Sequence, residues 1–205
     1  MRHIVKMVAT LAALAAACVA SPVNAGFIGL PHMLGPQLQK IAFAAPALPP
    51  FAHTRFCLQY PADCAPSHNH FRPRPIALNA ARLAELREIN RDVNRSIRFE
   101  ANEEGIAGER WVLSPKTGDC NDYAVTKRHD LIARGWPARM LLLAEVVTTW
   151  GEHHLVLVVR TRSGDLVADS LSTEIKPWTE APYRWVRIQT PAMPTFWATV
   201  GKAQV

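Results

Sequence analysis

The sequence predicts an α+β domain in which two helices come first and a run of antiparallel strands follows. Three observations support this fold class. An apolar stripe of helical period lies between residues 79 and 98, a second helical pattern lies between residues 119 and 134, and β-branched residues with period two dominate from residue 140 onward. Helices and strands segregated in this way are typical of a helix layer packed on an antiparallel sheet.

The first helix is predicted from Asn79 to Arg98. Asn79 is a favourable N-cap residue, because its side-chain oxygen can accept a hydrogen bond from a free backbone N–H of the first turn. We expect one face of this helix to pack in the core and the charged residues of the other face to be solvated. The apolar positions of the buried face are Leu83, Leu86, Ile89, Val93 and Ile97.

The second helix is predicted over residues 119–134, after a Gly-containing loop from Asn102 to Gly118. Asp119 can cap its N-terminus, and Gly135, two residues before a proline, is a typical helix stop. Cys120 therefore lies in the first turn of this helix.

Four strands are predicted after the second helix. Short turns containing Gly join the first three strands, which favours antiparallel neighbours. The predicted strands are Met140–Thr149, Glu152–Arg160, Leu166–Asp169 and Arg184–Ile188.

Residues 1–25 have the pattern of a secretory signal peptide. Arg2 and Lys6 flank the start of an apolar run, and small residues at Val23–Ala25 offer a cleavage site. The run is shorter than the ~20 apolar residues that cross a bilayer. We therefore expect cleavage after residue 25 and a periplasmic protein, with a lipoprotein anchored through Cys18 as the alternative.

Length and charge limit the remaining possibilities. The chain has 205 residues, which is long enough for one substantial core and short for two, so we expect one catalytic domain at residues 78–205. Removal of residues 1–25 lowers the net charge from +6 to +4. The remaining basic residues are spread along the chain, so we infer no nucleic-acid partner.

Residues 26–77 are predicted to form a Pro-rich arm. Nine prolines and little periodicity favour an extended segment with one short helix near Gln37–Ile41. In an oxidising compartment, Cys57 and Cys64 can form a disulfide that holds this arm together. The two histidines of the segment His68–His70 have no Cys or acidic residue nearby, so we assign them no metal site.

Cys120 is the odd cysteine that remains when Cys18 is removed and Cys57 pairs with Cys64. At a helix start, free N–H groups and the positive end of the helix dipole stabilise a thiolate. The same N–H groups can bind the oxyanion that forms when a thiolate attacks a carbonyl. A buried free thiol in the core is the alternative.

His154 and Asp169 are the candidate partners of Cys120. Neighbouring strand residues point to opposite faces, so only one of His153 and His154 can face the thiol. Asp169 lies on the next predicted strand, within reach of a cross-strand contact with His154. The order Cys, His, Asp is typical of papain-like and transglutaminase-like sites. A surface histidine and a strand-end carboxylate are the alternatives for these two residues.

Three segments of the chain resemble the bacterial transglutaminase-like cysteine proteinase family. They are Gly118–Lys127, His154–Leu157 and Leu166–Leu171, and the similarity extends from about Val93 to Trp178. The resemblance implies a papain-like or transglutaminase-like core whose nucleophile helix packs on an antiparallel sheet. It also implies the roles of the three candidate residues, with Cys120 as nucleophile, His154 rather than its neighbour as base, and Asp169 as orienting acid.

The resemblance further implies a calcium site. Family members that act on adhesins have acidic residues beside the nucleophile, and these correspond to Asp119, Asn121 and Asp122. Oxygen ligands of this kind suit calcium. Asn121 stands where an acidic residue is usual, which removes a charge and keeps a carbonyl ligand. An N-cap role for Asp119 and a dipole-complementing role for Asp122 are the alternatives.

Together these observations predict an exported cysteine endopeptidase that cuts a cell-surface or exported protein. The resemblance makes an adhesin the expected substrate and an inner-membrane receptor the expected regulator. Two other functions are compatible with the same residues. One is acyl transfer to an amine, as in transglutaminases, and the other is a non-catalytic binding module of the same fold.

Overall fold

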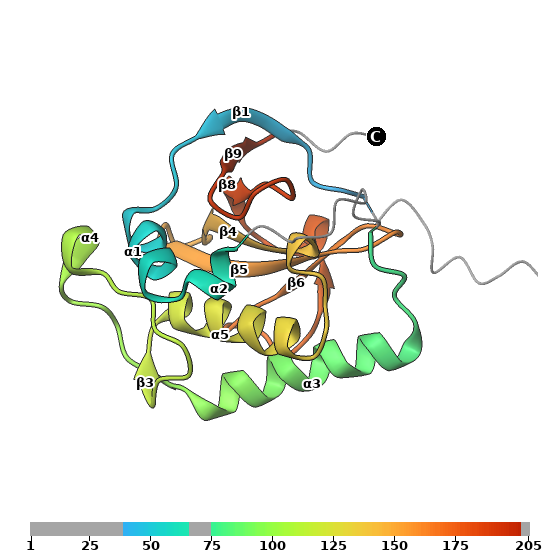
Figure 1. The fold of residues 1–205 in the computed structure, drawn as a ribbon, viewed down its shortest axis with the longest axis horizontal. Coiled ribbons are helices and arrows are strands. Elements are labelled where there is room, and N and C mark those ends of the chain that lie inside the picture. The colour runs from blue at the N-terminus through green and yellow to red at the C-terminus, as the bar shows by residue number, and fades with distance from the viewer. Residues whose placement is uncertain (1–38, 66–74, 202–205) are drawn as a thin grey trace, which may run out of the picture. The chain divides into compact units, whose positions relative to one another are not determined.

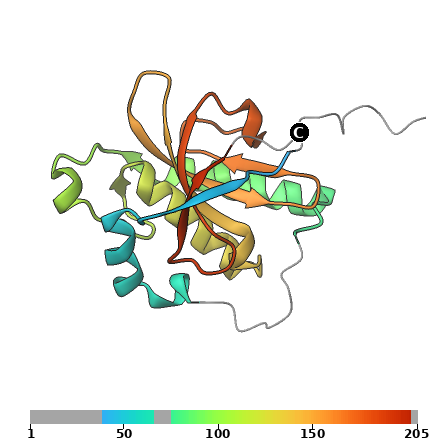
Figure 2. The ribbon, with the colours of Figure 1, turned by 90° about the horizontal axis from the view of Figure 1, so that it is seen from above.

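A seven-stranded antiparallel sheet forms the centre of the protein. The computed structural model describes residues 39–65 and 75–201. The strands follow the order β1-β9-β8-β4-β5-β6-β7. Helices α3 (Ala80–Ser96) and α5 (Cys120–Ala133) lie together on one face of the sheet (Figure 1, Figure 2). The predicted α+β class, with the helix that begins at Cys120 packed on an antiparallel sheet, is confirmed.

The strands of the sheet range from two to eight residues in length. Their bounds are β1 Phe43–Ala47, β4 Leu141–Val147, β5 His153–Arg160, β6 Asp165–Ala168, β7 Lys176–Pro177, β8 Arg184–Gln189 and β9 Trp197–Val200. A separate parallel pair consists of β2 Arg98–Phe99 and β3 Thr117–Gly118. The remaining helices are α1 Phe51–Gln59, α2 Pro61–Cys64, α4 Gly105–Gly108, and the 3-10 helices η2 Ala138–Met140 and η3 Trp178–Glu180.

The central strands β4 and β5 are buried on both faces. Successive residues of β4, such as Leu143 and Ala144, point to opposite faces of the sheet and enter two different apolar clusters. One cluster packs against α1, α3 and α5, and the other lies on the opposite face of the sheet around Trp178 and Ile188. Nearly continuous apolar sequence is what a strand with two buried faces requires. These strands therefore form a well-packed platform for the polar residues at the start of β5.

Both predicted helices begin directly after their predicted N-cap residues. The Asn79 side chain accepts a hydrogen bond of 2.8 Å from the N–H of Arg82 at the start of α3. Asp119 caps α5 in the same way, with Cys120 as the first helical residue. The loop between the two helices, predicted to be irregular, contains the short helix α4 and the strand β3.

The four predicted strands correspond to β4, β5, β6 and β8. Three other strands of the sheet, β1, β7 and β9, were not predicted. β1 and β7 are the two edges of the sheet and each contains a proline, which an edge strand tolerates because its outer N–H groups are not needed for pairing. These edge strands are defined by their neighbours, and no local pattern marks them.

The short helix predicted near Gln37–Ile41 is wrong for its described residues, which are not helical. Tertiary hydrogen bonds replace the local ones. The carbonyl of Gln39 accepts from the N–H of Asp165 at 3.0 Å and from Trp178 Nε1 at 2.9 Å. The N–H of Ile41 donates to Asp165 Oδ2 at 2.8 Å. This segment is therefore fixed by β6 and η3.

Several predictions for the N-terminal part of the chain fall outside the described residues. They concern the signal peptide at residues 1–25, Cys18 and the segment His68–His70. Within the described residues, no helix combines the length and apolar character that a membrane span requires.

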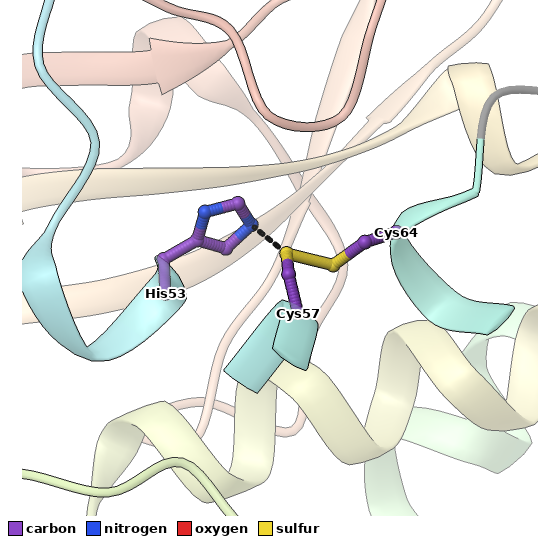
Figure 3. Close-up of side chains that lie close together, drawn as sticks. All are labelled: His53, Cys57 and Cys64. Atoms are coloured by element: carbon purple, nitrogen blue, oxygen red, sulfur yellow. Dashed lines mark hydrogen bonds between the residues drawn. A yellow bond between two sulfur atoms is a disulfide. The ribbon is translucent and has the colours of Figure 1, made fainter. Parts of the chain in front are cut away.

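The predicted disulfide between Cys57 and Cys64 is present and links α1 to α2. His53 lies beside it, with Nε2 3.5 Å from Cys57 Sγ (Figure 3). Among the described residues, these three side chains form the only cluster of His, Cys, Asp or Glu residues that has metal-binding geometry. Because both sulfurs are bonded to each other, the cluster holds a cross-link and offers no thiolate ligands.

His53 is buried and serves as a hydrogen-bond acceptor in the core. Gln189 Nε2 donates to His53 Nε2 at 2.9 Å, and the ring packs against Trp111 and Trp197. Burial, and secondarily the positive charge of Arg128, lower the pKa of His53 from 6.5 to about 4. The ring is therefore neutral in the folded protein at physiological pH.

Removal of the disulfide should destabilise the protein. The cross-link joins residues seven apart, and closing so short a loop in the unfolded chain corresponds to about 2.5 kcal/mol of the free energy of unfolding. We expect Cys57→Ser/Cys64→Ser to lose about this amount in denaturant unfolding. The single change Cys120→Ser removes a thiol without removing a cross-link and serves as the control. An unchanged midpoint in the double variant would contradict the expectation.

Acidification should destabilise the protein through His53. The folded-state pKa lies below the unfolded value, so the unfolded chain binds a proton that the folded chain does not. The stabilisation is complete above pH 6.5 and is lost as pH falls toward 4, by about 3 kcal/mol. Denaturant unfolding at several pH values should show a weaker acid dependence for His53→Gln than for the wild type. Parallel curves for the two proteins would refute this role.

Candidate active site

Cys120 is the first residue of α5 and is half-buried. Among the described residues, it is the only cysteine that is not part of a disulfide. The helix packs against β5, and the thiol forms a hydrogen bond with the backbone of Leu155 in that strand. The thiol therefore lies at the junction between the start of the helix and the start of the strand.

His154 forms a buried pair with Asp169. Their side chains are almost fully shielded from solvent, and His154 Nε2 lies 2.7 Å from Asp169 Oδ1. His154 is the second residue of β5, and Asp169 follows directly after β6, the strand that pairs with β5. The cross-strand approach expected from the sequence is therefore observed, although the pairing register itself ends at Leu157 and Ala168.

Two further groups hold the Asp169 carboxylate. The N–H of Leu171 donates to Oδ1 at 3.0 Å, and the Tyr183 hydroxyl donates to Oδ2 through a short hydrogen bond. Burial acts to raise the pKa of Asp169, but its bonds to His154 and Tyr183 together hold that pKa below its usual range. Burial and the neighbouring carboxylate raise the pKa of Tyr183. Asp169 is thus a buried carboxylate that stays ionised beside an imidazole.

His153 points away from this pair. Its side chain is 70% exposed, and Nδ1 lies 2.6 Å from Glu145 Oε1 on β4. Glu145 in turn accepts from Arg187 Nε at 2.5 Å. His153 thus belongs to a surface ion-pair network, whereas His154 belongs to a buried imidazole–carboxylate pair.

Two adjoining cavities of about 370 and 880 Å³ lie at Cys120. Both are lined by Glu109, Cys120, Asn121, His153 and His154. The smaller cavity extends to Pro50 and Phe51, and the larger one extends to Phe99, Trp150 and Leu171. The thiol therefore lies where two halves of a cleft meet, with apolar side chains along both halves.

The environment of Cys120 opposes its ionisation. Burial is the main cause, and the carboxylates of Asp119, Glu109 and Asp169 add to it, so the pKa of the thiol rises to about 12. The hydrogen bond from the Leu155 backbone acts in the other direction. A helix start therefore does not suffice here to make a stable thiolate. Ionisation of this thiol would require a base that takes up its proton or neutralisation of the nearby negative charge.

The helix start is also less open to an oxyanion than the sequence suggests. The N–H of Asn121 donates to Asp119 Oδ1 at 2.9 Å, and the N–H of Asp122 donates to the Asp119 carbonyl at 3.1 Å. These two first-turn groups are occupied by the cap. The N–H of Cys120 itself is the first-turn group that the cap leaves for an oxyanion.

Carboxylate oxygens of Asp119 and Glu109 gather beside the thiol, around the amide nitrogen of Asn121. Asn121 Nδ2 donates to Glu109 Oε1 at 2.6 Å and to Asp119 Oδ2 at 3.2 Å. Glu109 also accepts from Trp111 Nε1 at 3.0 Å. Burial is the main cause that raises the pKa of Glu109. Carboxylates are hard ligands of the kind that calcium prefers, and a turned Asn121 amide would add its oxygen, so this donor set fits the ion.

Asp122, in contrast, directs both carboxylate oxygens to the backbone. Oδ1 accepts from the N–H of Val112 at 2.7 Å, and Oδ2 accepts from the N–H of Asp119 at 3.1 Å. Burial raises its pKa to about 6. A Cβ atom at Gly118 would lie 2.2 Å from Oδ2, so glycine is needed there. Asp122 is thus a first-turn carboxylate, as its dipole-complementing alternative expected, and it also caps the helix start. Asp119 has the N-cap role that was its own alternative, and it remains beside the thiol together with Asn121.

Glu109 and Tyr183 were missed by the sequence analysis. Glu109 lies in the loop before β3, and Tyr183 lies just before β8, so neither belongs to a periodic pattern. Both reach the site through tertiary contacts with Asn121 and Asp169. No local signal in the sequence could have identified them.

The bacterial transglutaminase-like cysteine proteinase family model matches residues 43–205. The chain belongs to this family. The match includes β1 and α1 as well as the later residues that carry the motifs, and the family is one of cysteine peptidases. No curated protein sequence matches the chain.

The chain is also similar to solved structures of Legionella pneumophila LapG. One structure is 26% identical, with a TM-score of 0.44, and the match covers 51% of this chain and 62% of that chain. A calcium-bound LapG structure is 24% identical, with a TM-score of 0.49 and coverage of 60% and 72%. An EGTA-treated one is 23% identical, with a TM-score of 0.48 and coverage of 58% and 70%.

Proposed function

We propose that this protein is an exported cysteine endopeptidase that hydrolyses a peptide bond in an exported or cell-surface protein. The observation that carries the proposal is the placement of Cys120 and His154 in one cleft, with His154 bonded to the buried carboxylate of Asp169 at 2.7 Å. Membership of a cysteine proteinase family supports the same assignment.

In the proposed reaction, His154 removes the proton from the Cys120 thiol as the sulfur attacks the peptide carbonyl. Asp169 binds Nε2 of the imidazole, which leaves Nδ1 to exchange the proton and stabilises the imidazolium that forms. The imidazolium then protonates the departing amine, and an acyl-thioenzyme remains. Water, deprotonated by His154, hydrolyses this intermediate and releases the thiol. The high thiol pKa makes this coupled proton transfer necessary.

The two-sided cleft supports a polypeptide substrate that passes across Cys120. Phe51 lines one half, Trp150 and Leu171 line the other, and all three are more than half exposed. Resemblance to the family extends the proposal to an adhesin-like substrate, to an inner-membrane receptor as regulator, and to the periplasm as the location. The signal-peptide pattern of residues 1–25 supports export.

Calcium is a proposed ligand of this site. Asp119 and Glu109 supply carboxylate oxygens of the right chemistry, Asn121 would supply its oxygen when its amide is turned, and one of the LapG structures is calcium-bound. A bound divalent cation would offset the negative charge that now raises the thiol pKa. Asp122 is left out of the proposed ligand set because both of its oxygens bind backbone N–H groups.

The nucleophile can be tested with an exported proteome as substrate. We expect the wild type to generate new N-termini and Cys120→Ser to generate none. His154→Gln should lower the rate by about a thousandfold or more, because the thiol loses its base. His129→Gln, which changes a histidine paired with Asp63 outside both cavities, is the matched control and should stay within a few fold of the wild type.

Other products would select another function. New isopeptide bonds in place of new N-termini would show acyl transfer to an amine. Cleavage that persists in Cys120→Ser would exclude this thiol as the nucleophile. Partner binding by Cys120→Ser, with no cleavage by the wild type at any calcium concentration, would favour a non-catalytic binding module.

Calcium binding can be tested directly by titration calorimetry on the metal-free protein. We expect the wild type to bind calcium and to gain thermal stability from it. Asp119→Asn and Glu109→Gln should each weaken binding by about tenfold, because each removes one negative ligand. Glu174→Gln, a surface carboxylate bonded only to Lys176, is the control. Absence of any binding heat or thermal shift at millimolar calcium would rule the site out.

A further inference from the structure

Three polar side chains lie behind the candidate site on α3 and α5, and the reaction described above does not use them. Asn90 and Lys127 are 0% and 1% exposed, and Asn94 is half-buried. Buried polar groups are unfavourable unless they are hydrogen-bonded. Their presence in a helix–helix contact that could have been apolar therefore calls for a specific reason.

The two asparagines bind the backbone that carries Asp169. Asn94 Nδ2 donates to the Asp169 carbonyl at 2.9 Å and to the Ser172 carbonyl at 3.2 Å. Asn90 Nδ2, one helical turn earlier, donates to the same Ser172 carbonyl at 2.9 Å. The segment after β6 is therefore attached to α3 at both of its ends. It is also the segment whose carboxylate bonds to His154.

Lys127 faces this region from the other helix. Tyr123 Oη donates to the Ile97 carbonyl at 2.6 Å, and Arg134 bonds Glu88 at 3.1 Å, so α3 and α5 run antiparallel. One turn after Tyr123, Lys127 lies opposite the turn of α3 that contains Asn94. The charge of Asp169 acts on Lys127 and opposes the effect of burial, which lowers its pKa to about 7.

The other polar atoms of the three side chains do not bond one another. Within the described residues, Lys127 Nζ and the Oδ1 atoms of Asn90 and Asn94 are buried without a hydrogen-bond partner. An amide donates only through its nitrogen, so the orientation that leaves each Oδ1 unpaired is the one that places Nδ2 at the carbonyls of Asp169 and Ser172. The two asparagines therefore hold the segment without help from Lys127.

We propose that Asn90 and Asn94 are positioning residues that hold the Asp169–Ser172 segment so that the Asp169 carboxylate stays bonded to His154. The two amides fix the segment to α3 through their hydrogen bonds to the Asp169 and Ser172 carbonyls. This inference rests on the proposed function, in which that carboxylate orients the base. The charged and titratable groups near the device are Asp169, His154, Tyr183 and Tyr123.

Asn90→Leu and Asn94→Leu test the device, because each keeps the side-chain size and removes the amide that bonds the segment. Proton NMR of the free protein should show the ring N–H of the His154–Asp169 bond as a downfield signal in the wild type. We expect both variants to lose or shift that signal. On a peptide spanning the cleavage site, kcat should fall by at least about tenfold while KM stays nearly constant. The double variant should lose no more than either single one, since the residues act as a unit.

Ile89→Val, a core change in α3 that leaves every polar contact intact, separates misplacement from general destabilisation and should keep both the signal and kcat. If either variant fails to fold, the milder changes Asn90→Ser and Asn94→Ser give the same comparison. Wild-type signal and kcat in folded variants would overturn the proposal. The NMR readout needs no substrate. If the wild type were inactive, the proposed function would fail, and the NMR signals of the variants would still test this inference.

Discussion

The capping box at the start of α5 is the interaction on which the candidate site depends. Asp119 and Asp122 bond each other's backbone, and this fixes Cys120 as the first helical residue. The second oxygen of Asp122 holds the N–H of Val112, and so anchors the loop that brings Glu109 beside the thiol. Gly118 has no Cβ atom, and this leaves room for the Asp122 carboxylate. Loss of the box would therefore displace the thiol and the acidic groups around it together.

The same acidic groups create an electrostatic conflict. A helix start favours a thiolate, but burial and three nearby carboxylates disfavour it more strongly. In the proposed function, the imidazole of His154 resolves the conflict as the base, and its own partner Asp169 is held ionised by several hydrogen bonds. Such a mechanism would keep the thiol protonated between turnovers, which would limit its reaction with oxidants and other electrophiles.

The sequence predicts the parts of this fold that local patterns encode. The stripe of α3, the cap of α5 and the apolar strands β4 and β5 each carry a periodic or capping signal, and each appears with nearly the expected bounds. The adjacent histidines could not be separated by spacing alone, and the bond between His154 and Asp169 now distinguishes them. Glu109, Tyr183 and strand β1 could not be predicted, because distant tertiary partners define their positions.

Strand β1 pairs only with β9, and the hydrogen bond from the N–H of Ala45 to Thr199 Oγ1 spans 154 residues of sequence. Such a pairing is among the slowest contacts to form, since the loop between its ends must close first. During synthesis, β1 has no strand neighbour until β9 has left the ribosome. The sheet therefore cannot reach its full width before that strand emerges, and its first edge is the last part of the sheet to form.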